Sequence, residues 1–221
     1  MKTTQQVIDA IVGQGMLPLY FHPNEEKSSA ILRALYRSGV RAIEYTNRGA
    51  SAHSNFKKLI EIRNTEMQDL TLGIGTIKNL QQAKDYLAVG ADFLVSPGYD
   101  AEVAAYCVER DLFFGPGCMS PTEIMAAENT GVKFVKLFPG NLLGPEYMSS
   151  IRDIFPNMIF MPTGGVDTTQ ESISAWYNSG VKAVGMGSKL VSKALMEAGD
   201  YEGIEAICRK VLDIIAAIRN K

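Results

Sequence analysis

A lysine and a glutamate stand inside two short apolar segments that are typical of buried β-strands. Lys136 lies in the segment 134–138 (FVKLF) and Glu44 lies in the segment 42–46 (AIEYT). Burial disfavours the ammonium form, so a lysine in such a segment has a lowered pKa and offers a neutral amine that can attack a carbonyl. The iminium that forms is an electron sink, so a carbon–carbon bond β to it can break. Glu44 could carry the protons of that reaction.

Four copies of one short pattern place these two residues at equivalent positions. Each copy is a Gly, a Val or Ala, a charged residue and then apolar residues, and the copies begin at Gly39, Gly90, Gly131 and Gly180. The Gly is typical of a left-handed helix C-terminal cap, after which the chain turns into a strand. The fifth residues after the four glycines are Glu44, Val95, Lys136 and Gly185. If the copies are structurally equivalent, these residues share one layer of a barrel interior.

The elements that must position this layer alternate along the chain. Eight β-prone runs, each ending at or near Gly or Pro, are separated by longer stretches with helical periodicity; they cover 17–21, 42–46, 70–75, 93–95, 112–115, 134–138, 158–161 and 183–186. Such alternation predicts parallel strands. Eight units in 221 residues fit an α/β fold of the (β/α)₈ TIM-barrel type, a single domain over residues 1–221 with an N-terminal helix before the first strand. An open doubly wound sheet is the alternative.

An arginine follows the glutamate at the expected mouth of the barrel. Arg48 lies four residues after Glu44, beyond the carboxyl end of the second strand, where active sites of this fold are built. Its planar guanidinium suits a substrate carboxylate. The plainer alternatives are that Arg48 is a solvated loop charge, that Lys136 and Glu44 form a structural ion pair, or that one of them faces a helix.

Two glycine turns follow the last two predicted strands. They are 162–165 (PTGG) and 185–188 (GMGS), with a helix expected to begin near Ser188. Backbone N–H groups in such turns, together with a helix N-terminus, bind anions, and the loops after strands seven and eight are the usual phosphate position in this fold. The two turns together predict a phosphate site, although each alone could be an ordinary turn.

Composition excludes several classes of protein. The chain has 22 Lys plus Arg against 24 Asp plus Glu, with 46% hydrophobic residues, and no run of basic residues, so we expect no nucleic-acid partner. Its apolar runs are too short for a membrane span and no signal-peptide core is present, which predicts a cytoplasmic protein with no membrane partner. Three cysteines at no zinc spacing, and two isolated histidines, predict no metal. Cys118, Trp176 and the apolar stripe of the last helix are expected to be packing residues.

At these positions the sequence resembles the bacterial 2-dehydro-3-deoxy-phosphogluconate and 4-hydroxy-2-oxoglutarate aldolases, which are class I aldolases with a (β/α)₈ fold. The likeness covers nearly the whole chain. The segments that carry it, taken in order, are 39–41, 44–48, 73–76, 96–98, 116–117, 136–139, 162–165 and 187–188.

The resemblance implies that Lys136 is the Schiff-base lysine and Glu44 the general acid and base, with no cofactor. It implies that Arg48 and Thr76 hold the carboxylate of a 2-oxo acid. Thr163 resembles the position where a Thr accompanies preference for the gluconate configuration. The phosphate would be received by Gly164, Gly165, Gly187 and Ser188. Family members cleave a 2-oxo acid sugar phosphate in the Entner–Doudoroff route to pyruvate and glyceraldehyde 3-phosphate, and are commonly homotrimers.

The leading hypothesis is therefore a class I aldolase, a carbon–carbon lyase, acting on 2-dehydro-3-deoxy-6-phosphogluconate. Within the same chemistry, 4-hydroxy-2-oxoglutarate and 2-dehydro-3-deoxy-6-phosphogalactonate are alternative substrates. A phosphate-binding isomerase or epimerase would use Lys136 to polarise a carbonyl without a covalent bond. A barrel that binds a 2-oxo acid or sugar phosphate without turnover is the non-enzymatic alternative.

Overall fold

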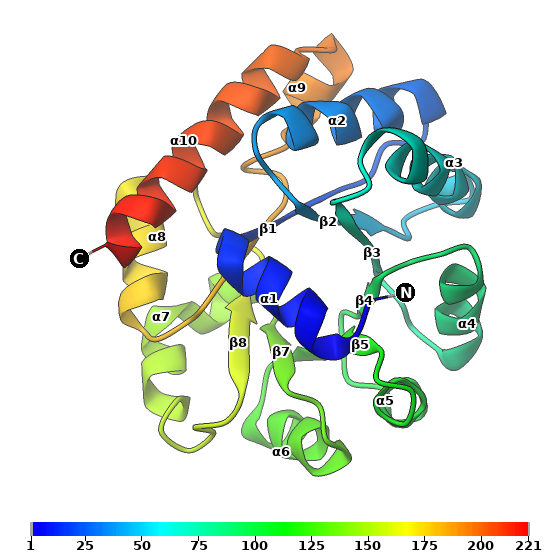
Figure 1. Ribbon diagram of the computed structural model, residues 1–221. Coiled ribbons are helices and arrows are strands. Elements are labelled where there is room, and N and C mark those ends of the chain that lie inside the picture. Colours follow the sequence, from blue (N-terminus) through cyan, green and yellow to red (C-terminus); the bar gives the residue numbers. More distant parts are fainter. Residues whose placement is uncertain (1, 221) are drawn as a thin grey trace.

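Short parallel strands form a curled sheet with helices around it in this computed structural model, which describes residues 2–220 (Figure 1). Along one part of the sheet the order is β5-β4-β3-β2-β1-β9, and along the other it is β6-β7-β8. Every pairing between these strands is parallel. The strands are β1 (Met16–Tyr20), β2 (Ala42–Thr46), β3 (Thr71–Gly75), β4 (Phe93–Val95), β5 (Phe113–Gly115), β6 (Gly117–Cys118), β7 (Phe134–Leu137), β8 (Ile159–Pro162) and β9 (Val184–Met186).

The strand order agrees with the predicted alternation and not with the doubly wound alternative. Strands β1 to β5 neighbour one another in chain order, without the reversal that defines a doubly wound sheet, and β1 pairs on its other side with β9. All eight predicted strands are present within one or two residues at each end. Sequence reasoning missed the break at Pro116, which has no N–H to donate and separates β5 from β6. The established architecture is an α/β fold whose parallel sheet curls into a half-barrel.

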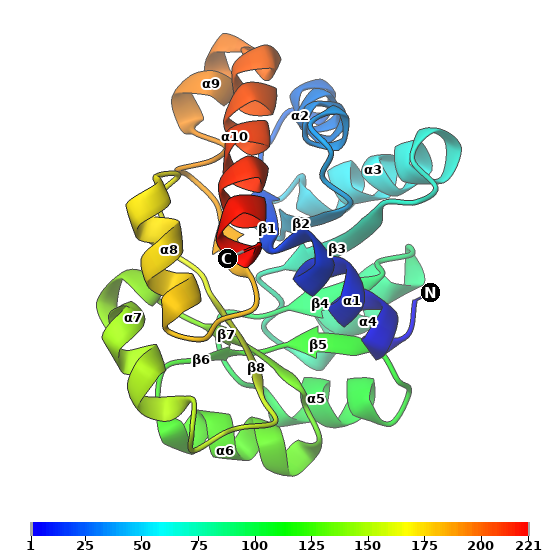
Figure 2. The same ribbon diagram turned by 60° about the vertical axis from the view of Figure 1, so that its left-hand side comes forward.

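Helices cover the outer side of the sheet, and one further helix crosses its end. Figure 1 shows α1 lying across the strands while the other helices form a ring around them, and Figure 2 shows α9 beside one end of α10. The helices are α1 (Thr4–Gln14), α2 (Glu25–Arg37), α3 (Ala52–Glu66), α4 (Leu80–Ala88), α5 (Ala101–Val108), α6 (Pro121–Thr130), α7 (Gly140–Ile151), α8 (Gln170–Asn178), α9 (Lys193–Ala198) and α10 (Tyr201–Arg219).

Local signals in the sequence explain where several helices begin and end. Thr3 before α1 and Ser120 before α6 each form a capping box with the residue three positions later. The four glycines of the repeated pattern all have left-handed φ values, between 95° and 106°, at the junctions between a helix and the next strand. These values confirm the predicted role of the repeated glycine, because side chains with a Cβ rarely adopt them.

Two apolar cores lie on the two sides of the sheet. The inner core joins α1 to side chains inside the curled sheet, and its buried members are Val7, Ile8, Ile11, Leu17, Ala42, Phe93, Val95, Phe113, Phe134, Met161 and Ala183. The outer core fills the space between sheet and helices and includes Cys118, Trp176, Ile204 and Val211, as predicted for packing residues. Strand side chains alternate between these cores because successive side chains point to opposite faces.

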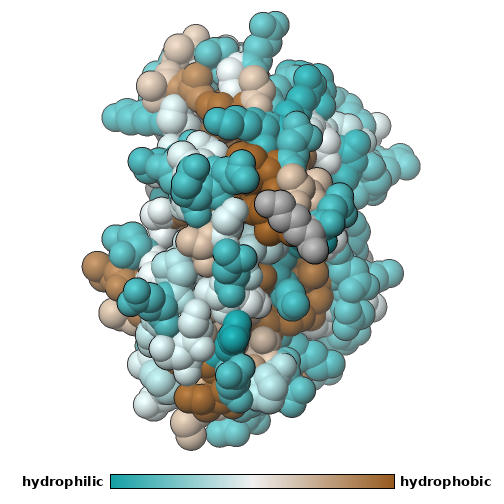
Figure 3. Space-filling model, turned by 90° about the vertical axis from the view of Figure 1, so that its left-hand side faces the viewer, coloured by the Kyte–Doolittle hydropathy of each residue, from teal (hydrophilic) through white to brown (hydrophobic). Residues whose placement is uncertain are grey.

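The outer faces of the helices are mostly hydrophilic. Figure 3 shows that hydrophilic side chains cover most of one face of the molecule and that the hydrophobic areas between them are small and separate. This follows from amphipathic helices that turn their apolar stripe to the outer core. Among the helices of residues 2–220, none combines the length and apolar character required to span a membrane.

Candidate active site

A pocket of about 270 Å³ opens at the carboxyl ends of the strands. Its walls come from the end of β1, the loop after β2, the residue after β7, the turns after β8 and β9, and α9. The sequence-predicted residues among its lining are Arg48, Thr163, Gly164, Gly165, Gly187 and Ser188. Residues from distant parts of the sequence meet here because parallel strands bring their carboxyl ends to one edge.

The predicted lysine and glutamate lie inside the curled sheet, at the end that carries this pocket. Lys136 on β7 is 5% exposed and Glu44 on β2 is 1% exposed. The Lys136 Nζ lies 5.1 Å from the centre of the Phe138 ring, and Phe138 itself lines the pocket. Lys136 is therefore neither on the surface nor against a helix, and its amine is adjacent to the pocket wall.

Glycines leave the space that two of the interior side chains occupy. A Cβ at Gly75 on β3 would fall on the Glu44 carboxylate, and a Cβ at Gly185 on β9 would fall on the Thr163 hydroxyl. All four residues of the predicted layer are buried, and Val95 belongs to the inner core. An interior layer that other barrels fill with branched apolar side chains is here partly emptied, and polar groups enter it.

The polar groups of this layer are not satisfied by the protein. Neither Glu44 carboxylate oxygen has a hydrogen-bond partner within residues 2–220, and the Thr163 Oγ1 has none either. A structural ion pair between Glu44 and Lys136 would have used those oxygens, so that alternative does not describe the arrangement. Unpaired buried polar groups cost free energy and persist mainly where a ligand completes them.

Burial shifts the pKa values of both ionisable groups toward their neutral forms. Desolvation raises the pKa of Glu44, although the nearby charges of Lys136 and Arg48 oppose the shift. Desolvation also lowers the pKa of Lys136, helped by Arg48 and opposed by Glu44. A neutral amine is a nucleophile, and a carboxyl group with a raised pKa can give as well as take a proton near neutral pH.

Arg48 and Thr76 lie at the ends of neighbouring strands. Arg48 follows β2 and lines the pocket. Thr76 follows β3, which pairs with β2, and the Asn47 amide donates to the Gly75 carbonyl at 2.9 Å. Thr76 is outside the pocket lining, but its φ of 64° is an unusual conformation for a β-branched residue. Such conformations concentrate at functional sites.

The two glycine turns lie side by side at the pocket, where the Thr163–Gly185 bridge joins the ends of their strands. In the turn after β8, Gly164 and Gly165 have φ values of 96° and 75°. In the turn after β9, the Gly187 carbonyl accepts hydrogen bonds from the Leu190 and Val191 amides. The expectation that a helix begins near Ser188 is wrong, because this single turn closes on itself and α9 begins only at Lys193, with Ser192 as its N-cap. The amides of Ser188 and Lys189 donate no hydrogen bond within residues 2–220.

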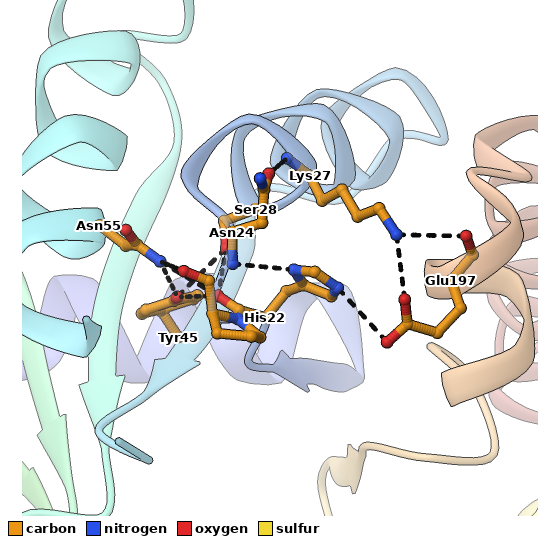
Figure 4. Close-up of polar contacts among 8 residues, drawn as sticks. His22, Asn24, Lys27, Ser28, Tyr45, Asn55 and Glu197 are labelled. Carbon is orange, nitrogen blue, oxygen red and sulfur yellow. Dashed lines mark hydrogen bonds and ion pairs between the residues drawn. The ribbon is translucent and has the colours of Figure 1, made fainter. Parts of the chain in front are cut away.

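A polar network fixes the end of β1 and the position of α9. The His22 carbonyl accepts hydrogen bonds from Ser28 Oγ, Tyr45 Oη and Asn55 Nδ2. On the other side, the His22 imidazole and the Lys27 ammonium both reach the Glu197 carboxylate, at 3.7 Å and 3.0 Å (Figure 4). Since Phe21 and Met196 line the pocket beside this network, it holds one wall of the pocket in place.

Some lining residues were not predicted. Phe21, Phe138 and Met196 contribute apolar surface, and nothing in their local sequence indicates a pocket. Lys189 also lines it, and its position directly after the second glycine turn was a usable signal. Within residues 2–220 no group of three or more His, Cys, Asp and Glu side chains is arranged to hold a metal ion.

Known proteins share both the sequence and the fold of this chain. The sequence profile of the family described as KDPG and KHG aldolase matches residues 7–207. The chain is 31% identical over 215 residues to the 2-dehydro-3-deoxy-phosphogluconate aldolase of Treponema pallidum, covering 96% of this chain and 99% of the relative. It is 28% identical to the KHG/KDPG aldolase of Escherichia coli K12, covering 96% and 98%.

One solved structure of similar fold is described with a covalent intermediate. The KDPG aldolase from Legionella pneumophila, described with pyruvate captured at low pH as a covalent carbinolamine, superposes with a TM-score of 0.85. The two chains are 25% identical, and the match covers 93% of this chain and 98% of the other. The similarity therefore extends over nearly all of this chain.

Proposed function

Because this chain belongs to the KDPG and KHG aldolase family, we propose that it is a class I aldolase that cleaves 2-dehydro-3-deoxy-6-phosphogluconate to pyruvate and glyceraldehyde 3-phosphate. The observation that carries the proposal is the pair of buried groups beside the pocket, the Lys136 amine and the Glu44 carboxylate, whose oxygens have no hydrogen-bond partner within residues 2–220. The reaction needs no metal or organic cofactor, because the iminium nitrogen serves as the electron sink.

Lys136 begins the reaction as the nucleophile. Its neutral amine attacks the C2 carbonyl of the substrate and forms a carbinolamine, which loses water to become an iminium. Glu44 supplies the proton that leaves with that water. The lowered pKa of Lys136 keeps the amine available, and the raised pKa of Glu44 lets it hold the proton that this step consumes.

Glu44 then reverses its role. As a carboxylate it removes the proton of the C4 hydroxyl, the C3–C4 bond breaks, and its electron pair moves to the iminium nitrogen to leave an enamine. Glyceraldehyde 3-phosphate departs. Protonation of the enamine at C3 and addition of water at C2 release pyruvate and restore the Lys136 amine. One carboxyl group can perform these opposite transfers only if its pKa lies near the working pH.

Two anion sites hold the ends of the substrate in this proposal. Arg48, together with Thr76 at the end of the neighbouring strand, receives the carboxylate. Gly164, Gly165, Gly187 and Ser188 receive the phosphate through backbone amides and the Ser188 hydroxyl. We assign to Thr163 the contact with the substrate hydroxyl that distinguishes the gluconate from the galactonate configuration, which its buried hydroxyl supports because it has no hydrogen-bond partner within residues 2–220.

Reductive trapping tests the covalent step. Borohydride added with pyruvate should leave a stable three-carbon adduct on Lys136. Since trypsin does not cleave after a modified lysine, the adduct should appear in a peptide covering 134–152 in place of its two fragments. Exposed Lys133, three residues away, is an internal control that should remain unmodified. Unmodified Lys136 in a protein that turns over the substrate would refute the Schiff-base mechanism and favour the isomerase-type use of this lysine.

We also propose that the curled sheet is closed, as in a (β/α)₈ barrel with β5 and β6 counted as one strand. The parallel bridge between Thr163 and Gly185 joins the ends of β8 and β9, and the Lys136 amide donates to the Pro116 carbonyl between β5 and β6 at 2.9 Å. These two contacts support closure at both junctions of the sheet.

A homotrimer that works in the cytoplasm is the assembly proposed for this aldolase. Within residues 2–220 the large exposed apolar side chains all lie between α5 and the segment just beyond α7, and they are Val108, Met119, Met125, Leu142 and Ile154. Exposed apolar side chains that gather into a patch are typical of an interface between subunits. Light scattering on the purified protein should give three times the chain mass of 24.1 kDa, and a monomer mass would contradict the trimer.

A further inference from the structure

Among residues 2–220, the pocket lining contains two cationic side chains and no carboxylate. Arg48 follows β2 and Lys189 follows β9. Strand β1 pairs between β2 and β9, and neighbouring strands lie about 4.8 Å apart, so the two strands that carry the cations are roughly 10 Å apart. Leu19 and Phe21 of β1 and its following loop line the space between them. A pocket of this form suits a substrate with an anion at each end.

Lys189 is already paired, but with a partner that it can leave at little cost. Its Nζ lies 3.2 Å from Asp167 Oδ2, and the two side chains are 57% and 40% exposed. Ion pairs at this exposure contribute little to stability, because water and salt screen the attraction between the two charges. Asp167 keeps other hydrogen bonds when Lys189 departs, because its Oδ1 accepts from the Thr168 amide at 2.7 Å.

Asp167 and Lys189 follow the two glycine turns, so their pairing holds the Lys189 ammonium at the end of the pocket where those turns meet. Whether Lys189 leaves Asp167 for the substrate then depends on the charge of the substrate group that enters. A substrate carboxylate carries one negative charge, as Asp167 does, so Lys189 gains little electrostatic attraction when it exchanges Asp167 for that carboxylate. A phosphate carries between about −1.5 and −2 charges at pH 7 and attracts the ammonium more strongly than Asp167.

We propose that Lys189 is the specificity-determining residue at this end of the pocket, and that its exchange from Asp167 to the substrate selects a phosphate over a carboxylate. The proposal rests on the function proposed above and adds a side-chain cation to an anion site otherwise made of backbone amides and one hydroxyl. Asp167 competes equally with both substrates, so it lowers their apparent affinities by the same factor, and the selection itself comes from the stronger attraction of Lys189 for the phosphate.

The test compares two substrates in matched variants. For Lys189→Gln, the ratio of kcat/KM for 2-dehydro-3-deoxy-6-phosphogluconate to that for 4-hydroxy-2-oxoglutarate should fall about tenfold, the value expected when one hydrogen bond to a charged group is lost. The change should be in KM for the phosphorylated substrate and not in its kcat, because the contact is equally present in the ground and transition states. Lys189→Arg should retain most of the ratio.

Two further variants separate this role from a structural one. Lys193→Gln removes an exposed lysine of α9 that does not line the pocket and should leave both kcat/KM values unchanged. Asp167→Asn removes the competitor for both substrates, so it should lower both KM values and leave their ratio unaltered. If the Lys189–Asp167 pair only fastens the two turns together, either variant, Lys189→Gln or Asp167→Asn, will weaken the binding of both substrates to the same extent. That result would overturn the proposal.

The failure of this inference differs from the failure of the proposed function. If the wild-type protein cleaves neither substrate and traps no pyruvate on Lys136, the aldolase assignment itself is wrong. If it cleaves both and the ratio is the same in Lys189→Gln, the aldolase assignment stands and Lys189 is not the selecting residue.

Discussion

The two ends of the curled sheet are built from the same strands but differ in role: the amino end is packed with apolar side chains, and the carboxyl end carries the pocket. At the amino end, α1 covers the strands and the interior contains Ala42, Phe134 and Ala183 packed in the inner core. Two residues further along the chain in each case, at the same interior face, stand Glu44, Lys136 and Gly185. One end is filled and apolar, whereas at the other the space over two glycines is occupied by the Glu44 carboxylate and the Thr163 hydroxyl, which have no hydrogen-bond partner within residues 2–220.

The difference teaches that stability and chemistry are separated along each strand. Aromatic contacts support the amino end, where the Phe113 and Phe134 rings pack edge-to-face at 5.1 Å between centres. Packing there can hold the strands firmly enough to keep the buried Glu44 carboxylate and Lys136 amine in place at the other end. Substitutions at the two ends should therefore have different consequences.

The largest effect is expected for Lys136→Met, which should lower kcat by at least about 10⁴-fold, as loss of a covalent nucleophile does elsewhere. The substitution should not lower the free energy of unfolding. The lowered pKa of Lys136 means that the folded state holds this proton less tightly than the unfolded state, so the buried amine lowers stability at neutral pH, and a methionine of similar length relieves that cost. Chemical denaturation should show an unchanged or higher free energy of unfolding, and a clear decrease would contradict the separation.

The converse substitution lies two residues away on the same face. Phe134→Ala removes an almost fully buried ring from the inner core and should lower the free energy of unfolding by about 3–5 kcal/mol. The folded molecules that remain should still trap pyruvate on Lys136. Denaturation curves give the first quantity and trapping per folded molecule gives the second. Normal stability together with loss of trapping would contradict the comparison, because it would show that Phe134 at the amino end serves the chemistry and not the stability.

A smaller effect with a distinctive pH dependence is expected for Glu44→Gln. Loss of the proton carrier should reduce kcat by about 10²- to 10⁴-fold, with iminium formation and C–C cleavage both slowed. Because burial raises the pKa of Glu44, the folded protein holds that proton more tightly than the unfolded chain. The contribution of the protonated Glu44 carboxyl to the stability of the fold is thus present at low pH and is lost as the pH rises from about 4.5 through the raised pKa.

The free energy of unfolding, measured across this pH range in the wild type and in Glu44→Gln, tests the direction of this pH dependence. The wild type should lose stability relative to Glu44→Gln as the pH rises, and at neutral pH the Gln variant should be the more stable. A wild-type protein that gains stability over the same range would show that Glu44 is held as a paired carboxylate.

The sequence by itself determined the order of the elements and the chemistry at their ends. Alternating strand and helix patterns, the repeated glycine and the apolar segments around Lys136 and Glu44 are local signals, and each is read from neighbouring residues. They sufficed to predict the eight strands and to place Arg48 and the two glycine turns at the carboxyl edge. The resemblance to a known family then gave these residues their expected roles.

Only the tertiary structure decided what depends on distant parts of the chain meeting. It placed Gly75 beneath the Glu44 carboxylate and Gly185 beneath Thr163, it interrupted the fifth strand at Pro116, and it moved the start of α9 away from Ser188. It also brought Lys189 to Asp167 across two turns. Local periodicity contains no information about which side chain fills the space above a glycine on another strand, because that is settled by packing between strands.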